Sequence, residues 1–144
     1  MISFLTHPIV LLTIGGAVGT NARYWLGVWI ASHRWTEHFP LATFVINVSG
    51  SLLLGLFVLP FHNRLPHWWI LLGVGFCGGY TTFSTFTLET VDLFRRHHQP
   101  GLALLNVVGS VVIGCLVTWL ALVGMESIYP KGPHEPPVME VEDP

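Results

Sequence analysis

Four long apolar stretches alternate along the chain with segments that carry nearly all of its charged residues. These stretches cover residues 8–31, 41–59, 68–88 and 102–123. Each has close to the ~20 residues that an α-helix needs to cross the hydrocarbon core of a bilayer. A transmembrane β-barrel would instead show segments of ~10 residues with alternating hydrophobicity. The pattern therefore predicts an all-α membrane protein with four transmembrane helices.

The composition supports the same class. Hydrophobic residues make up 51% of the chain and charged residues 10%, and the mean hydropathy is +0.61. An ordinary soluble domain carries about 25% charged residues, so this class is excluded. The formal net charge of −2 gives no reason to expect a nucleic-acid partner.

Residues 125–144 differ in composition from the rest of the chain. They hold five of the ten prolines and five of the eight acidic residues. Segments of this kind cannot bury enough apolar surface to order themselves. We therefore expect a transmembrane domain over residues 1–124 and a disordered, acidic, proline-rich tail over residues 125–144.

The third apolar stretch contains an unusual polar run. Two glycines, Gly78 and Gly79, precede the hydroxyl-rich segment 80–87. Backbone groups freed by a helix break are costly in hydrocarbon unless they are paired or line a wet cavity. Broken helices accordingly occur where a membrane protein must hold an ion. We predict that the third helix is broken near Gly78–Thr81 and that this segment belongs to an ion pathway.

Polar side chains in the other stretches could extend such a pathway. An arginine is costly at a helix centre, so Arg23 is expected either to face a watery vestibule and attract anions or to snorkel or pair. Asn47 could donate hydrogen bonds to an anion; the alternative is that it joins two helices. Asn106, Ser110 and Thr118 are spaced by four and eight residues, so they form one stripe of neutral donors along a helix face.

Two phenylalanines follow the predicted break. Phe83 and Phe86 are three residues apart and share a helix face. The edge of an aromatic ring carries positive potential, so two rings turned edge-on could contact a small anion. The alternative is that both are ordinary packing residues. No acidic residue lies deep in a span: Glu89 and Asp92 come at the end of the third stretch, where Asp92 can pair with Arg95 or Arg96.

The charges flanking the stretches leave the orientation in the membrane nearly balanced. With four spans, Arg64 and Lys131 lie on the side of the termini, and Arg34, Arg95 and Arg96 lie on the other side. Orientation is set by Lys/Arg asymmetry, so we expect insertion in both orientations. The alternative is that three against two suffices and that the non-terminal side is cytoplasmic.

Four helices leave little room for a polar pathway within one copy. Helices are about 10 Å in diameter, and small residues that allow close packing recur as Gly15-x-x-x-Gly19 and Ser110-x-x-x-Gly114. A pathway between two protomers is easier to build. A homodimer follows as a hypothesis.

Three segments together resemble the Fluc (CrcB) fluoride channel family: residues 15–24 (GGAVGTNARY), residues 43–50 (TFVINVSG) and residues 75–86 (GFCGGYTTFSTF). The resemblance covers residues 8–124. It implies a fluoride-specific channel, not an enzyme, built as an antiparallel dual-topology homodimer with two pores in a prokaryotic inner membrane. Such a channel lets the membrane potential drive fluoride out of the cell, which lowers its toxicity.

The resemblance also implies roles for single residues. Asn47 would donate to fluoride, Phe83 and Phe86 would line the path with their edges, and Ser110 would belong to a polar track. Arg23 would lie near a vestibule.

A structural, non-transported sodium ion is implied as well, held by the backbone carbonyls of Gly78 and Thr81 of both protomers. This chain departs from the family at two positions. Ala42 stands where glycine is common, and Gly114 stands where a hydroxyl residue would extend the polar track.

Two other classes of function remain open from the sequence. A small dual-topology drug exporter also has four helices and dimerises, but it needs a carboxylate deep in a span. A membrane scaffold would use the glycines and phenylalanines for packing alone. Ion flux, or its absence, after reconstitution separates these classes.

Overall fold

The computed structural model describes residues 6–33, 39–62 and 64–130. The predicted tail 125–144 therefore lies outside the described residues from residue 131 onward, and so do Arg34 and Lys131. The helices are α2 (Pro8–Ser32), α3 (Leu41–Phe61), α4 (Pro66–Trp68), η1 (Trp69–Cys77), α5 (Gly78–Tyr80), α6 (Phe83–Arg95) and α7 (Pro100–Ile128).

The prediction of an all-helical chain is confirmed for the described residues. Three long helices, α2, α3 and α7, correspond to the first, second and fourth apolar stretches, and α4, η1, α5 and α6 together form the third. Every segment extends beyond the apolar stretch that predicts it. The last helix continues to Ile128, past the boundary expected at Gly124.

Local sequence explains where several helices begin. Proline occupies a first-turn position of α2, α4 and α7, where its missing N–H would have no helical partner. The side chain of His7 caps α2, since its Nδ1 accepts the Ile9 N–H at 3.4 Å. Pro60 does not end α3 but lies one residue before its last residue, Phe61.

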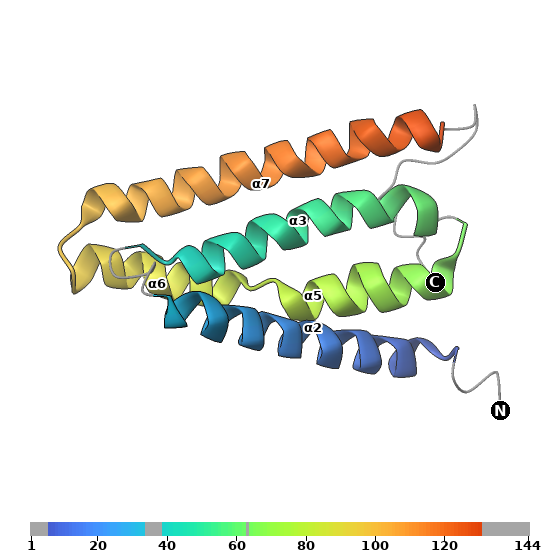
Figure 1. The fold of residues 1–144 in the computed structure, drawn as a ribbon, viewed down its shortest axis with the longest axis horizontal. Helices are drawn as coiled ribbons and strands as arrows, with labels where there is room; N and C mark the ends of the chain where they lie inside the picture. The colour runs from blue at the N-terminus through green and yellow to red at the C-terminus, as the bar shows by residue number, and fades with distance from the viewer. Residues whose placement is uncertain (1–5, 34–38, 63, 131–144) are drawn as a thin grey trace, which may run out of the picture.

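The helices lie side by side in the order α7, α3, the η1–α5–α6 segment and α2 (Figure 1). The segment η1–α5 packs closely against α2, while α7 packs along α3 and contacts α6. Within the described residues, α3 and α7 have the length and mean hydropathy, 2.1 and 2.3, of membrane-spanning helices. Both helices agree with a membrane protein.

Glycines allow the close approach of two helix pairs. A Cβ on Gly15 would overlap the Leu71 carbonyl oxygen, so α2 can touch the η1 backbone only without a side chain there. A Cβ on Gly55 would lie 2.9 Å from the Ala121 Cβ and 3.0 Å from the Thr118 carbonyl oxygen. Glycine at this position lets α3 and α7 pack tightly, as small residues do between membrane helices.

Candidate functional site

The third helical segment is interrupted at two threonines. Thr81 has φ −81° and ψ 161°, and Thr82 has φ −150° and ψ 121°, so both are extended between α5 and α6. Gly78 keeps helical angles of φ −64° and ψ −37°. The Thr82 Oγ1 then accepts the Thr85 N–H at 3.3 Å and caps α6.

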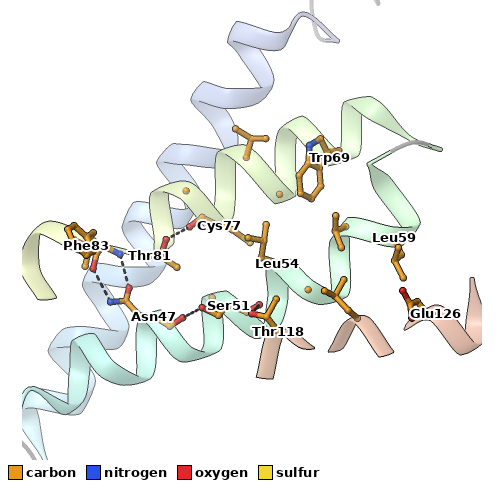
Figure 2. A pocket seen from close by; sticks show the side chains of 18 residues that line it. Asn47, Ser51, Leu54, Leu59, Trp69, Cys77, Thr81, Phe83, Thr118 and Glu126 are labelled. Atoms are coloured by element: carbon orange, nitrogen blue, oxygen red, sulfur yellow. Dashed lines mark hydrogen bonds between the residues drawn. The ribbon is translucent and has the colours of Figure 1, made fainter. Parts of the chain in front are cut away.

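Asn47 on α3 binds the backbone of this interruption with both ends of its amide. Its Oδ1 accepts the Thr82 N–H at 2.8 Å, and its Nδ2 donates to the Thr82 carbonyl oxygen at 2.9 Å (Figure 2). The Asn47 side chain therefore takes the place of a backbone partner for both the N–H and the carbonyl of Thr82. One Nδ2 hydrogen remains after these bonds, because a primary amide has two.

Arg23 approaches the same interruption from α2. Its Nη1 donates to the Thr81 carbonyl oxygen at 3.2 Å, and its side chain is half-buried. The guanidinium therefore pairs with the backbone inside the fold and does not extend to a helix end. Thr20 also donates from α2, to the Gly79 carbonyl oxygen at 3.4 Å.

Tyr80 fixes the turn that precedes the interruption. Its hydroxyl lies 2.8 Å from the Ser49 Oγ on α3, and its ring stacks on Phe76 at 5.6 Å between centroids. Tyr80 is buried. Side chains of α2, α3 and η1 thus hold the segment from both sides.

A cavity of about 730 Å³ lies between α3, the η1–α5–α6 segment and α7 (Figure 2). Its polar lining includes Asn47, Ser51, Thr81, Thr82 and Thr118, and its apolar lining includes Leu54, Val58, Leu59, Trp69, Val74 and Leu122. Figure 2 shows Phe83 at one end and Glu126 near the other. The interruption therefore opens onto a hollow that has hydroxyl and amide groups on one part of its wall.

The two phenylalanines lie side by side at the start of α6. Their ring centroids are 5.7 Å apart and the rings are inclined by 41°. Phe83 is 76% exposed within one copy of the chain, whereas Phe86 is half-buried. An aromatic side chain this exposed at the mouth of a cavity is open to contact with an ion or a partner.

The predicted polar stripe on α7 divides between two neighbours. Asn106 is 1% exposed and donates through Nδ2 to the Thr90 Oγ1 at 2.8 Å, and Thr90 donates to the Phe86 carbonyl oxygen at 2.8 Å. Ser110 donates to the Asn106 Oδ1 at 3.5 Å. Thr118 instead faces α3 and donates to the Ser51 carbonyl oxygen at 3.1 Å.

The structure also brings out a carboxylate that sequence reasoning placed at the end of a span. Glu89 lies within α6 and accepts from the Thr43 Oγ1 on α3 at 2.9 Å through Oε1. Among the described residues, its Oε2 is buried without a hydrogen-bond partner. Glu89 lies well inside this helix, because α6 begins at Phe83 and runs to Arg95.

The predicted pairing of Asp92 is confirmed: its carboxylate lies 3.2 Å from the Arg96 guanidinium.

Comparison with known proteins adds to this geometry. Residues 10–122 match the family described as CrcB-like protein, Camphor Resistance (CrcB). A protein of Acidobacterium capsulatum named "Fluoride-specific ion channel FluC" is 45% identical over 115 residues, which cover 78% of this chain and 90% of that protein. A protein of Listeria monocytogenes serotype 4b named "Fluoride-specific ion channel FluC 1" is 48% identical over 115 residues, which cover 78% and 92%.

Proposed function

The chain belongs to the CrcB-like family, and from this premise we propose that it is a fluoride-specific channel that conducts F⁻ passively across a cell membrane. The observation that carries the proposal is the match over residues 10–122, which include α3, η1, α5, α6 and most of α7 around the cavity, together with relatives named as fluoride channels. The chain acts as a channel and not as an enzyme, because those names describe ion conduction.

Fluoride would move along the polar part of the cavity wall. Selective passage requires that protein donors replace the water that the ion loses. The free Nδ2 hydrogen of Asn47 and the edges of Phe83 and Phe86 supply positive potential without a titratable group. Ser110 on α7 continues the path, and Arg23 attracts the anion toward the interruption.

A second copy of this chain, in antiparallel orientation, would complete the cavity. One side of α7 is covered by α3. Of the most apolar 18-residue window of α7, only 6% is buried within one copy of the chain. Trp119 and Val111 on α7 are 59% and 56% exposed. The near balance of flanking Lys and Arg residues supports insertion in both orientations, which an antiparallel dimer needs. The resulting two pathways would each use residues of both protomers.

A structural sodium ion would be held by the backbone carbonyl groups of Gly78 and Thr81 of both protomers. Oxygen ligands from unwound backbone suit a hard cation and hold Na⁺ in other broken membrane helices. The Thr82 N–H, which a continuous helix would give to the Gly78 carbonyl, is bound to Asn47 instead. The Thr81 carbonyl oxygen accepts one bond from Arg23 and keeps a second lone pair. When bound, the ion would supply a fixed positive charge that joins the two interruptions.

Passive conduction suffices for the biological role. Hydrogen fluoride crosses a membrane as a neutral weak acid and dissociates in a less acidic cytoplasm, which traps the anion. A selective pore in the inner membrane lets the membrane potential, worth ≈2.3 kcal/mol per charge per 100 mV, drive fluoride out. The protein therefore lowers cytoplasmic fluoride without an energy-coupling step.

Fluoride efflux from proteoliposomes tests the proposal. A fluoride electrode follows the native chain and the variants Phe83→Ile, Phe86→Ile and Asn47→Ala, with a chloride electrode as the control. Fast efflux that excludes chloride, and its loss in the phenylalanine variants, is expected. Folded protein that shows no fluoride flux would overturn the channel assignment. An Asp92→Asn variant, altered in an ion pair away from the cavity, should conduct as the native chain does.

A further inference from the structure

The ladder of helical hydrogen bonds stops at one identifiable peptide group. The Thr81 N–H still reaches the Cys77 carbonyl oxygen at 3.0 Å, which closes the last turn. In a continuous α-helix the next bond would join the Thr82 N–H to the Gly78 carbonyl oxygen. That N–H lies 2.8 Å from the Asn47 Oδ1 instead. The Gly78 carbonyl is thus the first in the segment to lose its helical donor.

Asn47 also keeps the Thr82 backbone groups from rejoining the helical hydrogen-bond pattern. Its Nδ2 donates to the Thr82 carbonyl oxygen at 2.9 Å, so the amide holds both polar groups of Thr82 at once. Thr82 itself is buried, with 9% exposure. In such surroundings an N–H seeks a partner, and without Asn47 the acceptor one helical turn away is the Gly78 carbonyl.

We propose that Asn47 is a positioning residue for the sodium site. By binding the Thr82 N–H through Oδ1, it keeps the Gly78 carbonyl available to the cation in each protomer. This inference rests on the proposed sodium site at Gly78 and Thr81. It assigns the two ends of one amide to different tasks, because Oδ1 maintains the cation ligands while the remaining Nδ2 hydrogen faces the fluoride path.

Without Asn47, the Gly78 carbonyl would accept a helical hydrogen bond again and would no longer be available as a cation ligand. The Thr82 N–H would turn toward Gly78, and each protomer would lose one oxygen from the cation site. Loss of a group that orients a metal ligand typically lowers metal affinity about 10–100-fold. Loss of a residue that only donates to fluoride would leave sodium binding unchanged.

Sodium binding can be measured apart from conduction. The purified dimer is heated in detergent with sodium chloride or with choline chloride at equal ionic strength, and the sodium-dependent rise in melting temperature is titrated, because a ligand of the folded state stabilises it by mass action. Asn47→Ala is expected to shift the sodium titration about 10–100-fold toward higher concentration. Ser110→Ala, the matched control on the same fluoride path, should lose fluoride efflux but keep the native sodium titration.

The outcomes separate this inference from the proposed function. A native sodium titration in Asn47→Ala would overturn the inference, whatever its fluoride efflux. If Asn47→Ala does not fold, Asn47→Leu decides, since it keeps a side chain of similar size but offers no acceptor to the Thr82 N–H. It should shift the sodium titration as Asn47→Ala does; a native titration would overturn the inference. A native chain that conducts fluoride but shows no sodium response would overturn the sodium site and leave the channel standing.

Discussion

Replacement of Gly15 by alanine should force α2 away from η1, whereas the same change at its neighbour Gly16 should not. A Cβ at Gly15 would overlap the Leu71 carbonyl oxygen and lie 2.9 Å from the Phe76 nitrogen and 3.1 Å from the Gly75 Cα. All three are backbone atoms, so no side-chain rotation relieves the contact. At Gly16 the nearest atom, the Gly75 carbonyl oxygen, lies 3.9 Å away, which is ordinary contact.

The two variants allow the steric cost to be isolated. Alanine is favoured over glycine within a helix by about 0.8–1 kcal/mol, and this gain is common to both positions. Overpacking costs about 1–3 kcal/mol when the neighbours cannot rearrange. The difference in unfolding free energy between Gly15→Ala and Gly16→Ala is therefore the steric term alone, about 1–3 kcal/mol.

Thermal unfolding of the purified protein in detergent, followed by tryptophan fluorescence, measures this difference. For a chain of this size, it corresponds to a melting temperature roughly 3–10 °C lower for Gly15→Ala than for Gly16→Ala. Gly16→Ala should unfold at or slightly above the native temperature. Equal melting temperatures for the two variants would refute the close contact of α2 with the η1 backbone.

Three further outcomes are expected. Asn106→Leu should lower the free energy of unfolding by about 1 kcal/mol, because it removes the hydrogen bond to Thr90 that joins α6 and α7. In a double-mutant cycle, adding Thr90→Val should lower the free energy of unfolding by little more. Gly78→Ala should leave the protomer folded, since its Cβ would have no atom within 4 Å, but should weaken the dimer in crosslinking and reduce fluoride efflux; unaltered dimer and efflux would argue against a partner at Gly78. Asp92→Asn should leave the melting temperature unchanged, because the Arg96 side chain of this pair is 78% exposed, and a clear fall would contradict that reasoning.

The helical segments could be predicted because membrane spans are recorded in local composition. The position of the interruption was less accessible. The sequence directs attention to Gly78 and Gly79 as helix breakers, yet Gly78 stays helical and the extended residues are Thr81 and Thr82. Gly79 serves packing, since a Cβ there would meet the Gly16 backbone. Glycine allows both a bend and a close approach, and only the position of the neighbouring helix decides which of these applies.

The partners of the polar side chains depend on helix rotation, which the sequence does not record. Asn106, Ser110 and Thr118 share a face by spacing, but Asn106 turns to α6 and Thr118 to α3. For Asn47, the sequence offered a donor to an anion or a link between helices. The structure shows a link to the helix interruption, and it leaves one N–H for the first role.

The N–H and carbonyl of Thr82 and the carbonyl of Thr81 find partners within one copy of the chain, whereas much of the apolar surface of α7 is exposed there. Asn47 binds the N–H and carbonyl of Thr82, and Arg23 binds the carbonyl of Thr81, so the interruption can form as soon as α2, α3 and α5 pack. Donors fixed in advance need no reorganisation when an ion arrives. The apolar face of α7, by contrast, stays exposed until another surface covers it. Membrane helices insert before they associate. Changes at the interruption should therefore alter the folding of the protomer itself, and changes on the exposed face of α7 should alter association first.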